Sequence, residues 1–209
     1  MGLGVRIPLT ADLKIFEETV DIGREVVWLH TFGQRFADAR RGRPIDGPRA
    51  RPYAEMPRNT IAIPDDPNDM PDELLYEYRT RTLHVGAGSF FPVSSATWEY
   101  RVNGMPVVRK WFGYRKRNPA GRRSSSRLSE LRAKRWTDAM TGELLDLLTI
   151  LDCCVRLEPL QLDRLERILN HPLIPIAELV NDRVAVGTRI RRVPKPRVSA
   201  EQLAIQADW

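Results

Sequence analysis

The side chains whose chemistry is easiest to interpret are the arginines and lysines between Arg101 and Arg135. This segment holds twelve basic residues and one acidic residue, Glu130, so its formal charge is about +11. The whole chain carries only +6, and the rest of it is therefore net acidic. A positive charge concentrated in this way is typical of a surface that binds a polyanion. The segment thus predicts nucleic-acid binding, although composition alone does not distinguish DNA from RNA.

Residues 107–117 are predicted to form a helix with an apolar sector and a basic sector. Because successive side chains on a helix turn by about 100°, Arg115 alone among its basic residues falls within the apolar sector. It is expected to extend past Trp111 to solvent, or to bond an acidic group or a base edge. The other cations suit a phosphate backbone. For this helix alone, a solvated basic face without a ligand is the alternative.

The helix is followed by a loop of small residues and arginines, "NPAGRRSSSR". Arginine offers forked donors for phosphate or guanine, and serine hydroxyls donate to phosphate oxygens. This loop, together with the scarcity of acids around it, favours a binding surface over a solvated one. The residues expected to contact DNA are Arg109, Lys110, Arg115, Lys116, Arg117, Arg122, Arg123, Ser124 and Arg127.

Motifs for catalysis are missing from the sequence. It contains no Gly-rich phosphate loop ending in Gly-Lys-Ser/Thr, no Asp/Asn-Pro-Pro-aromatic signature and no Gly-x-Ser-x-Gly turn. The three histidines, His30, His84 and His171, are scattered, and each is expected to be structural. The acidic run at residues 64–73 lacks calcium-loop spacing, which favours a solvated loop. We therefore expect a chain that is not an enzyme on its own, with no cofactor and no metal.

Cysteine and tryptophan are expected to serve packing. Cys153 and Cys154 are adjacent in an apolar stretch, whereas a disulfide or a zinc site needs separated partners. Buried thiols are therefore predicted. Four tryptophans can stack on bases: Trp28, Trp98, Trp111 and Trp136. Three of them have apolar neighbours at helical or strand spacing, which favours core packing over stacking.

The helices and strands that must position these residues are predicted to form an α+β fold. Residues 12–36 form an amphipathic helix in this interpretation, with Leu13, Phe16, Val20, Gly23 and Val27 on its apolar face. Residues 40–73 hold seven prolines and form an irregular connection with one short strand at "TIAI". A β-hairpin follows at residues 74–78 and 83–85, and further extended chain reaches Val102 before the turn signal "NG" at 103–104.

Helices are predicted to dominate the C-terminal half. Residues 137–157 read as a core helix, Glu158 and Pro159 as a break, and the next dozen residues as a second helix. The result is a small antiparallel β platform beside a helical bundle, with the N-terminal amphipathic helix. We expect residues 1–180 to form one folded domain and residues 181–209 to be a basic, mobile tail. With no apolar run of membrane-spanning length and no signal peptide, a cytoplasmic protein is expected.

Several ordered blocks resemble a known family. They are "RIPLTAD", "REVVWLHTFGQRF", "TRTLHVGAGSFFPV", "WEYRVNGMPVVRKWFGYRK", "GRRSS", "RWTDAMTGELLDLL" and "LEPLQLDRLERIL". In this order they are similar to the C-terminal specificity region of single-chain Type ISP restriction–modification enzymes. The resemblance spans roughly residues 6–180.

This resemblance implies a non-catalytic module that reads a sequence in double-stranded DNA. It would position the duplex for an adenine methyltransferase and a restriction machinery carried elsewhere. The chain begins at Met1 just before this region, so a split subunit, a remnant or a fragment is expected, with the methyltransferase or restriction subunit supplied in trans. One alternative is an assembly subunit that docks on a methyltransferase chain and hardly binds DNA itself. A weaker alternative is an RNA-binding protein.

Overall fold

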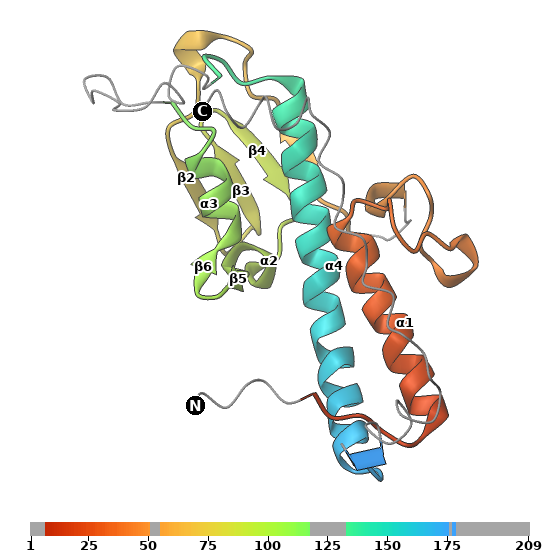
Figure 1. Cartoon of the computed structure of the whole chain (residues 1–209). Coiled ribbons are helices and arrows are strands. Elements are labelled where there is room, and N and C mark those ends of the chain that lie inside the picture. The colour runs from red at the N-terminus through yellow and green to blue at the C-terminus, as the bar shows by residue number, and fades with distance from the viewer. Residues whose placement is uncertain (1–6, 51–54, 118–132, 176, 179–209) are drawn as a thin grey trace, which may run out of the picture.

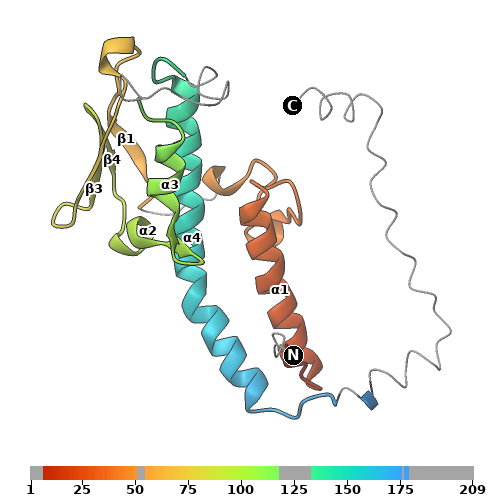
Figure 2. The same cartoon turned by 60° about the vertical axis from the view of Figure 1, so that its left-hand side comes forward.

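One long helix, α4 (Asp138–Leu169), is the spine of the protein. The computed structural model describes residues 7–50, 55–117, 133–175, 177 and 178. A four-stranded sheet lies on one side of the first half of α4, together with the short helices α2 (Ser95–Glu99) and α3 (Val107–Gly113) (Figure 1; Figure 2). Helix α1 (Leu13–His30) lies on another side (Figure 1; Figure 2). The predicted α+β class is confirmed. The predicted tail at 181–209 falls outside the described residues.

The sheet is the predicted β platform. It contains β1 (Arg58–Ile61), β2 (Leu74–Glu77), β3 (Thr82–Val85) and β4 (Gly88–Phe91), antiparallel in the order β1-β4-β3-β2. The predicted hairpin is β2–β3. Alternate side chains point to one face, and the buried set packs with α3, α4 and the connecting segments in a single core: Tyr76, Leu83, Val85, Phe90, Val93 and Trp98 among others.

The connection before the sheet is irregular, as predicted. It contains three single-turn 3₁₀ helices at Ala39–Arg41, Pro48–Ala50 and Pro67–Asp69, and β1 is its one strand within the described residues. Prolines fix φ and remove backbone donors, so this part of the chain cannot join a longer helix or a central strand.

The extended chain predicted before Val102 is wrong in part, because residues Ser95–Glu99 form a helix, α2. Ser94 caps it by accepting a hydrogen bond from the backbone N–H of Thr97, at 3.1 Å. The predicted "NG" turn is confirmed between β5 (Arg101–Val102) and β6 (Met105–Pro106). Asn103 and Gly104 adopt positive φ angles of 51° and 78°, as a tight hairpin turn requires.

The basic helix is shorter than predicted. Helix α3 spans Val107–Gly113 and buries Val108 and Phe112, so the expectation of a helix to residue 117 is wrong. After the helix, the backbone N–H groups of Arg115 and Lys116 both bond the Phe112 carbonyl, and the N–H of Arg117 bonds the Pro71 carbonyl at 2.7 Å. The basic residues of α3 and those at 115–117 therefore do not lie on one continuous helix face.

The predicted break at Pro159 is also wrong, since α4 continues through it. Packing explains the continuity. Ile150, Cys153, Cys154 and Leu157 form a second core cluster with Trp28 and Leu29 of α1. Both thiols are buried, as predicted, and burial raises the pKa of Cys154 to about 11, so this thiol stays protonated at neutral pH.

Helix α1 is confirmed, but it ends at His30 and not at residue 36, and its predicted apolar face is wrong. The buried residues are Ile15, Trp28 and Leu29, whereas Leu13 and Phe16 are exposed. The pairing with α4 sets this rotation, since α4 covers the face that carries Trp28. Among the described residues, no helix combines the length and hydropathy needed to cross a bilayer.

Candidate nucleic-acid interface

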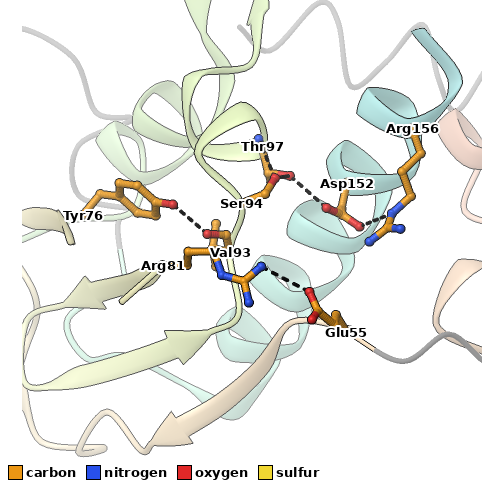
Figure 3. A network of polar contacts seen from close by, with 8 residues as sticks. All are labelled: Glu55, Tyr76, Arg81, Val93, Ser94, Thr97, Asp152 and Arg156. Atoms are coloured by element: carbon orange, nitrogen blue, oxygen red, sulfur yellow. Dashed lines mark hydrogen bonds and ion pairs between the residues drawn. The ribbon is translucent and has the colours of Figure 1, made fainter. Parts of the chain in front are cut away.

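A buried polar network fixes helix α2 against α4 (Figure 3). The Thr97 hydroxyl donates to Asp152 Oδ1 at 3.3 Å and lies 2.8 Å from the Ser94 hydroxyl. Asp152 Oδ2 accepts from Arg156 Nε at 2.8 Å. Because the carboxylate of Asp152 is buried but bonded on both oxygens, the network ties the start of α2 to the middle of α4.

The segment entering α2 is fixed to the sheet in the same way (Figure 3). The buried Tyr76 hydroxyl donates to the Val93 carbonyl at 2.7 Å, and the Val93 N–H donates to the Arg81 carbonyl at 2.8 Å. The Arg81 side chain reaches Glu55, at 3.1 Å. Helix α2 is thus positioned from both sides, and its last two residues, Trp98 and Glu99, take defined places.

Glu99 is the centre of a group that we name the Glu99 cluster. It consists of the buried Trp98 and four partly exposed residues: Tyr78, Glu99, Arg101 and Arg109. The Tyr78 hydroxyl donates to Glu99 Oε1 at 2.6 Å. Arg109 approaches the same oxygen at 3.4 Å, and Arg101 approaches Oε2 at 3.8 Å. The hydrogen bond from Tyr78, helped by the two arginines, lowers the pKa of Glu99, so its carboxylate is ionised at neutral pH.

Arg109 of α3 is held on a second side by an aromatic stack. Its guanidinium carbon lies 4.4 Å from the centroid of the Trp98 ring, within cation–π range. Trp98 is buried and stacks on Tyr76, with ring centroids 5.4 Å apart and planes 18° from parallel. The guanidinium is therefore oriented while 43% of the side chain remains exposed.

Arg115 has a different environment. It donates from Nε and NH2 to Glu143 Oε2, at 3.1 and 2.6 Å, and it lies over the Trp111 ring at 4.1 Å. Of the alternatives expected for this residue, extension past Trp111 or a bond to an acid or a base edge, the structure shows the bond to an acid. Since Glu143 neutralises it, Arg115 is less available for a phosphate than Lys110 or Lys116.

Lys110 and Lys116, the two lysines among the predicted DNA contacts, form no ion pair with an acid of the described residues. No carboxylate of the described residues lies within ion-pair distance of either ammonium. Lys110 Nζ instead lies 5.0 Å from the centroid of Tyr114. Both ammonium groups can therefore meet a phosphate without first giving up an ion pair.

Arg117 and Arg135 bind the acidic segment that precedes β2. Arg117 donates to the carbonyls of Pro67 and Asn68, and Arg135 forms an ion pair with Asp65 at 3.3 Å. The predicted loop contacts Arg122, Arg123, Ser124 and Arg127 belong to residues 118–132, outside the described part of the chain. The acidic run at residues 64–73 is therefore not merely a solvated loop, because it contacts Arg117 and Arg135, which lie on either side of residues 118–132.

Acids distant in the sequence thus reduce the local positive charge. Glu99, Glu143 and Asp65 each pair with a basic residue of the segment between Arg101 and Arg135. Of these ion pairs, the sequence indicated only the one formed by Arg115, because a charged side chain in an apolar sector needs a polar partner. The Glu99 cluster was missed, since Tyr78 comes from the end of β2 and Trp98 from an unpredicted helix.

The described part of the structure holds no candidate metal centre. No three His, Cys, Asp or Glu side chains there gather closely enough to hold a metal ion. A hollow of about 650 Å³ lies along α1 and the end of α4, with Phe16 and Leu160 in its lining. A more apolar hollow of about 390 Å³ contains Ile22 and Leu165. Neither is lined by the basic segment.

The comparisons with known proteins agree with this arrangement. The family model described as the Type ISP C-terminal specificity domain matches residues 3–147, which include the sheet, α2, α3 and the whole basic segment. Neither the curated proteins nor the solved structures give a match. Specificity domains of this kind are recognition modules for DNA targets in restriction–modification. The chain belongs to the Type ISP C-terminal specificity domain family.

Proposed function

We propose that this chain reads a sequence in double-stranded DNA and positions the duplex for an adenine methyltransferase and restriction machinery carried elsewhere. The contacts would come from α3 and the residues after it, with the Glu99 cluster beside them. The observation that carries the proposal is the pair of uncompensated cations, Lys110 and Lys116, beside an oriented, half-exposed Arg109. Point charges suit phosphates, whereas an oriented guanidinium suits a directional acceptor.

A binding selection tests this function. The purified chain is mixed with a random duplex library at near-physiological salt, and the retained DNA is sequenced. An enriched short motif supports sequence recognition. Retention without a motif contradicts it and leaves a non-specific basic surface. Preferential competition by duplex RNA would instead indicate an RNA-binding protein.

The salt dependence of binding is expected to depend on Lys110 and Lys116. Each phosphate contact contributes about −0.9 to the slope of log affinity against log salt. Replacing both lysines by Ala should therefore reduce the magnitude of the slope by nearly two, measured by fluorescence anisotropy on one duplex at several salt concentrations.

The matched control removes two positive charges from α1, where Lys14 and Arg24 are exposed. The variant Lys14→Ala/Arg24→Ala changes net charge equally and should leave the slope nearly as it is. Equal effects of the two pairs would mean that only overall charge matters, and would argue against a phosphate-binding face at α3.

Exposed apolar side chains favour a second function, docking on a separate methyltransferase chain. Leu13 and Phe16 of α1 and Leu160, Leu162 and Leu165 of α4 are all at least 42% exposed. Larger apolar patches of this kind often mark protein–protein contacts. Failure of the chain to retain any DNA in the selection, with binding restored by an added methyltransferase subunit, would support this alternative.

A further inference from the structure

Arg109, like Arg115, has its head group fixed between a tryptophan ring and a carboxylate, but more of its side chain is exposed, 43% against 29%. One face of the guanidinium lies over the buried Trp98 ring, and its NH2 group approaches Glu99 Oε1. Lys110, its neighbour on α3, has an aromatic contact but no acid partner. Arg109 thus has a defined orientation before any ligand binds, and ordering it on binding costs less side-chain entropy.

The carboxylate in this cluster indicates which part of DNA is contacted. Glu99 is ionised, and an ionised acid facing a phosphate backbone is repelled by it. The same acid is useful if it orients an arginine toward a base edge. The Tyr78 hydroxyl already donates to Glu99, and Arg101 approaches its other oxygen. The carboxylate is therefore engaged with three partners and acts as an internal anchor.

The fork of an oriented guanidinium matches one base in particular. Guanine presents two acceptors, N7 and O6, side by side on its major-groove edge, and arginine can bind both at once. A lysine ammonium has no such fork and is suited to phosphates. The half-exposed head of Arg109 leaves donors free for this purpose, beside the phosphate-suited Lys110 on the same helix.

We propose that Arg109 reads a guanine of the DNA target, and that Trp98 and Glu99 position its guanidinium for that contact. This inference rests on the proposed function and adds the base class and the positioning residues. Tyr78 is a further positioning residue, because its hydroxyl donates to the Glu99 carboxylate that orients Arg109.

The test repeats the duplex-library selection with Arg109→Lys, which keeps the charge but removes the fork. The wild-type motif should contain a guanine that the variant no longer selects. On a motif duplex and a duplex with that single base pair exchanged, the discrimination ratio should fall by about 5- to 150-fold, the range that one bidentate contact supplies. Lys110→Ala is the matched control, expected to weaken binding to both duplexes while preserving their ratio.

Glu99→Gln tests the positioning role. It should reduce discrimination at the same guanine position and at no other, which a general loss of stability would not do. Thermal unfolding of each variant verifies the fold. A wild-type motif that Arg109→Lys leaves unchanged overturns this inference alone. A motif lacking guanine does the same, whereas a wild-type protein that enriches no motif overturns both this inference and the proposed function.

Discussion

Replacing Trp136 by Ala is expected to lower the free energy of unfolding by about 3–5 kcal/mol, the usual cost of truncating a buried tryptophan. Its side chain is 1% exposed, and the indole N–H donates to the Thr141 hydroxyl at 2.8 Å. The ring also contacts Trp111 edge-on and Phe112 at a tilt, with centroids 6.1 and 6.4 Å away. The change therefore removes packing between α3 and the start of α4. Urea unfolding followed by circular dichroism measures it.

Tyr114→Ala is the matched control, because Tyr114 lies in the same region but is exposed. Surface substitutions usually change stability by less than about 0.5 kcal/mol. A loss below about 1 kcal/mol for Trp136→Ala would show that Trp136 is not part of the core. The residue immediately follows Arg135, so its burial also determines where the chain rejoins the core after the basic segment.

The sheet was predictable because its signals are local. The alternation along β2 and β3 and the turn residues 103–104 fix strands and turns within a few positions. Helix α2 escaped prediction because "SATWEY" is β-prone, while the Ser94 cap and the burial of Trp98 against Tyr76 favour a helix. Tertiary packing overrode local propensity there, as it often does for short segments.

The candidate site was predictable in residue type more than in arrangement. The excess of arginine and lysine marked the right segment, and the family match includes it. The acids that pair with it come from 10, 28 and 70 residues away: Glu99 with Arg109, Glu143 with Arg115, and Asp65 with Arg135. Pairings of this kind depend on the fold, so spacing in the sequence cannot reveal them.

Pro159→Ala is expected to raise the free energy of unfolding by up to about 3 kcal/mol, the helix-interior difference between proline and alanine. Proline has no N–H, so the Val155 carbonyl receives no helical bond from residue 159. Pro159 is itself exposed, so the substitution removes no core packing. The helix tolerates the residue because Leu157 and Ile168 on either side of it are buried. Urea unfolding, with helicity from circular dichroism, measures the gain.

Gln161→Ala serves as the control for Pro159→Ala, since it replaces an exposed residue of α4 two positions further on. Its effect should stay within about 0.5 kcal/mol. If the chain instead broke into two helices at Glu158 and Pro159, the N–H of an alanine at position 159 could not form a helical hydrogen bond with the Val155 carbonyl. Pro159→Ala would then leave stability unchanged or reduce it. The sign of this one change therefore distinguishes a continuous α4 from the break that local sequence rules predict.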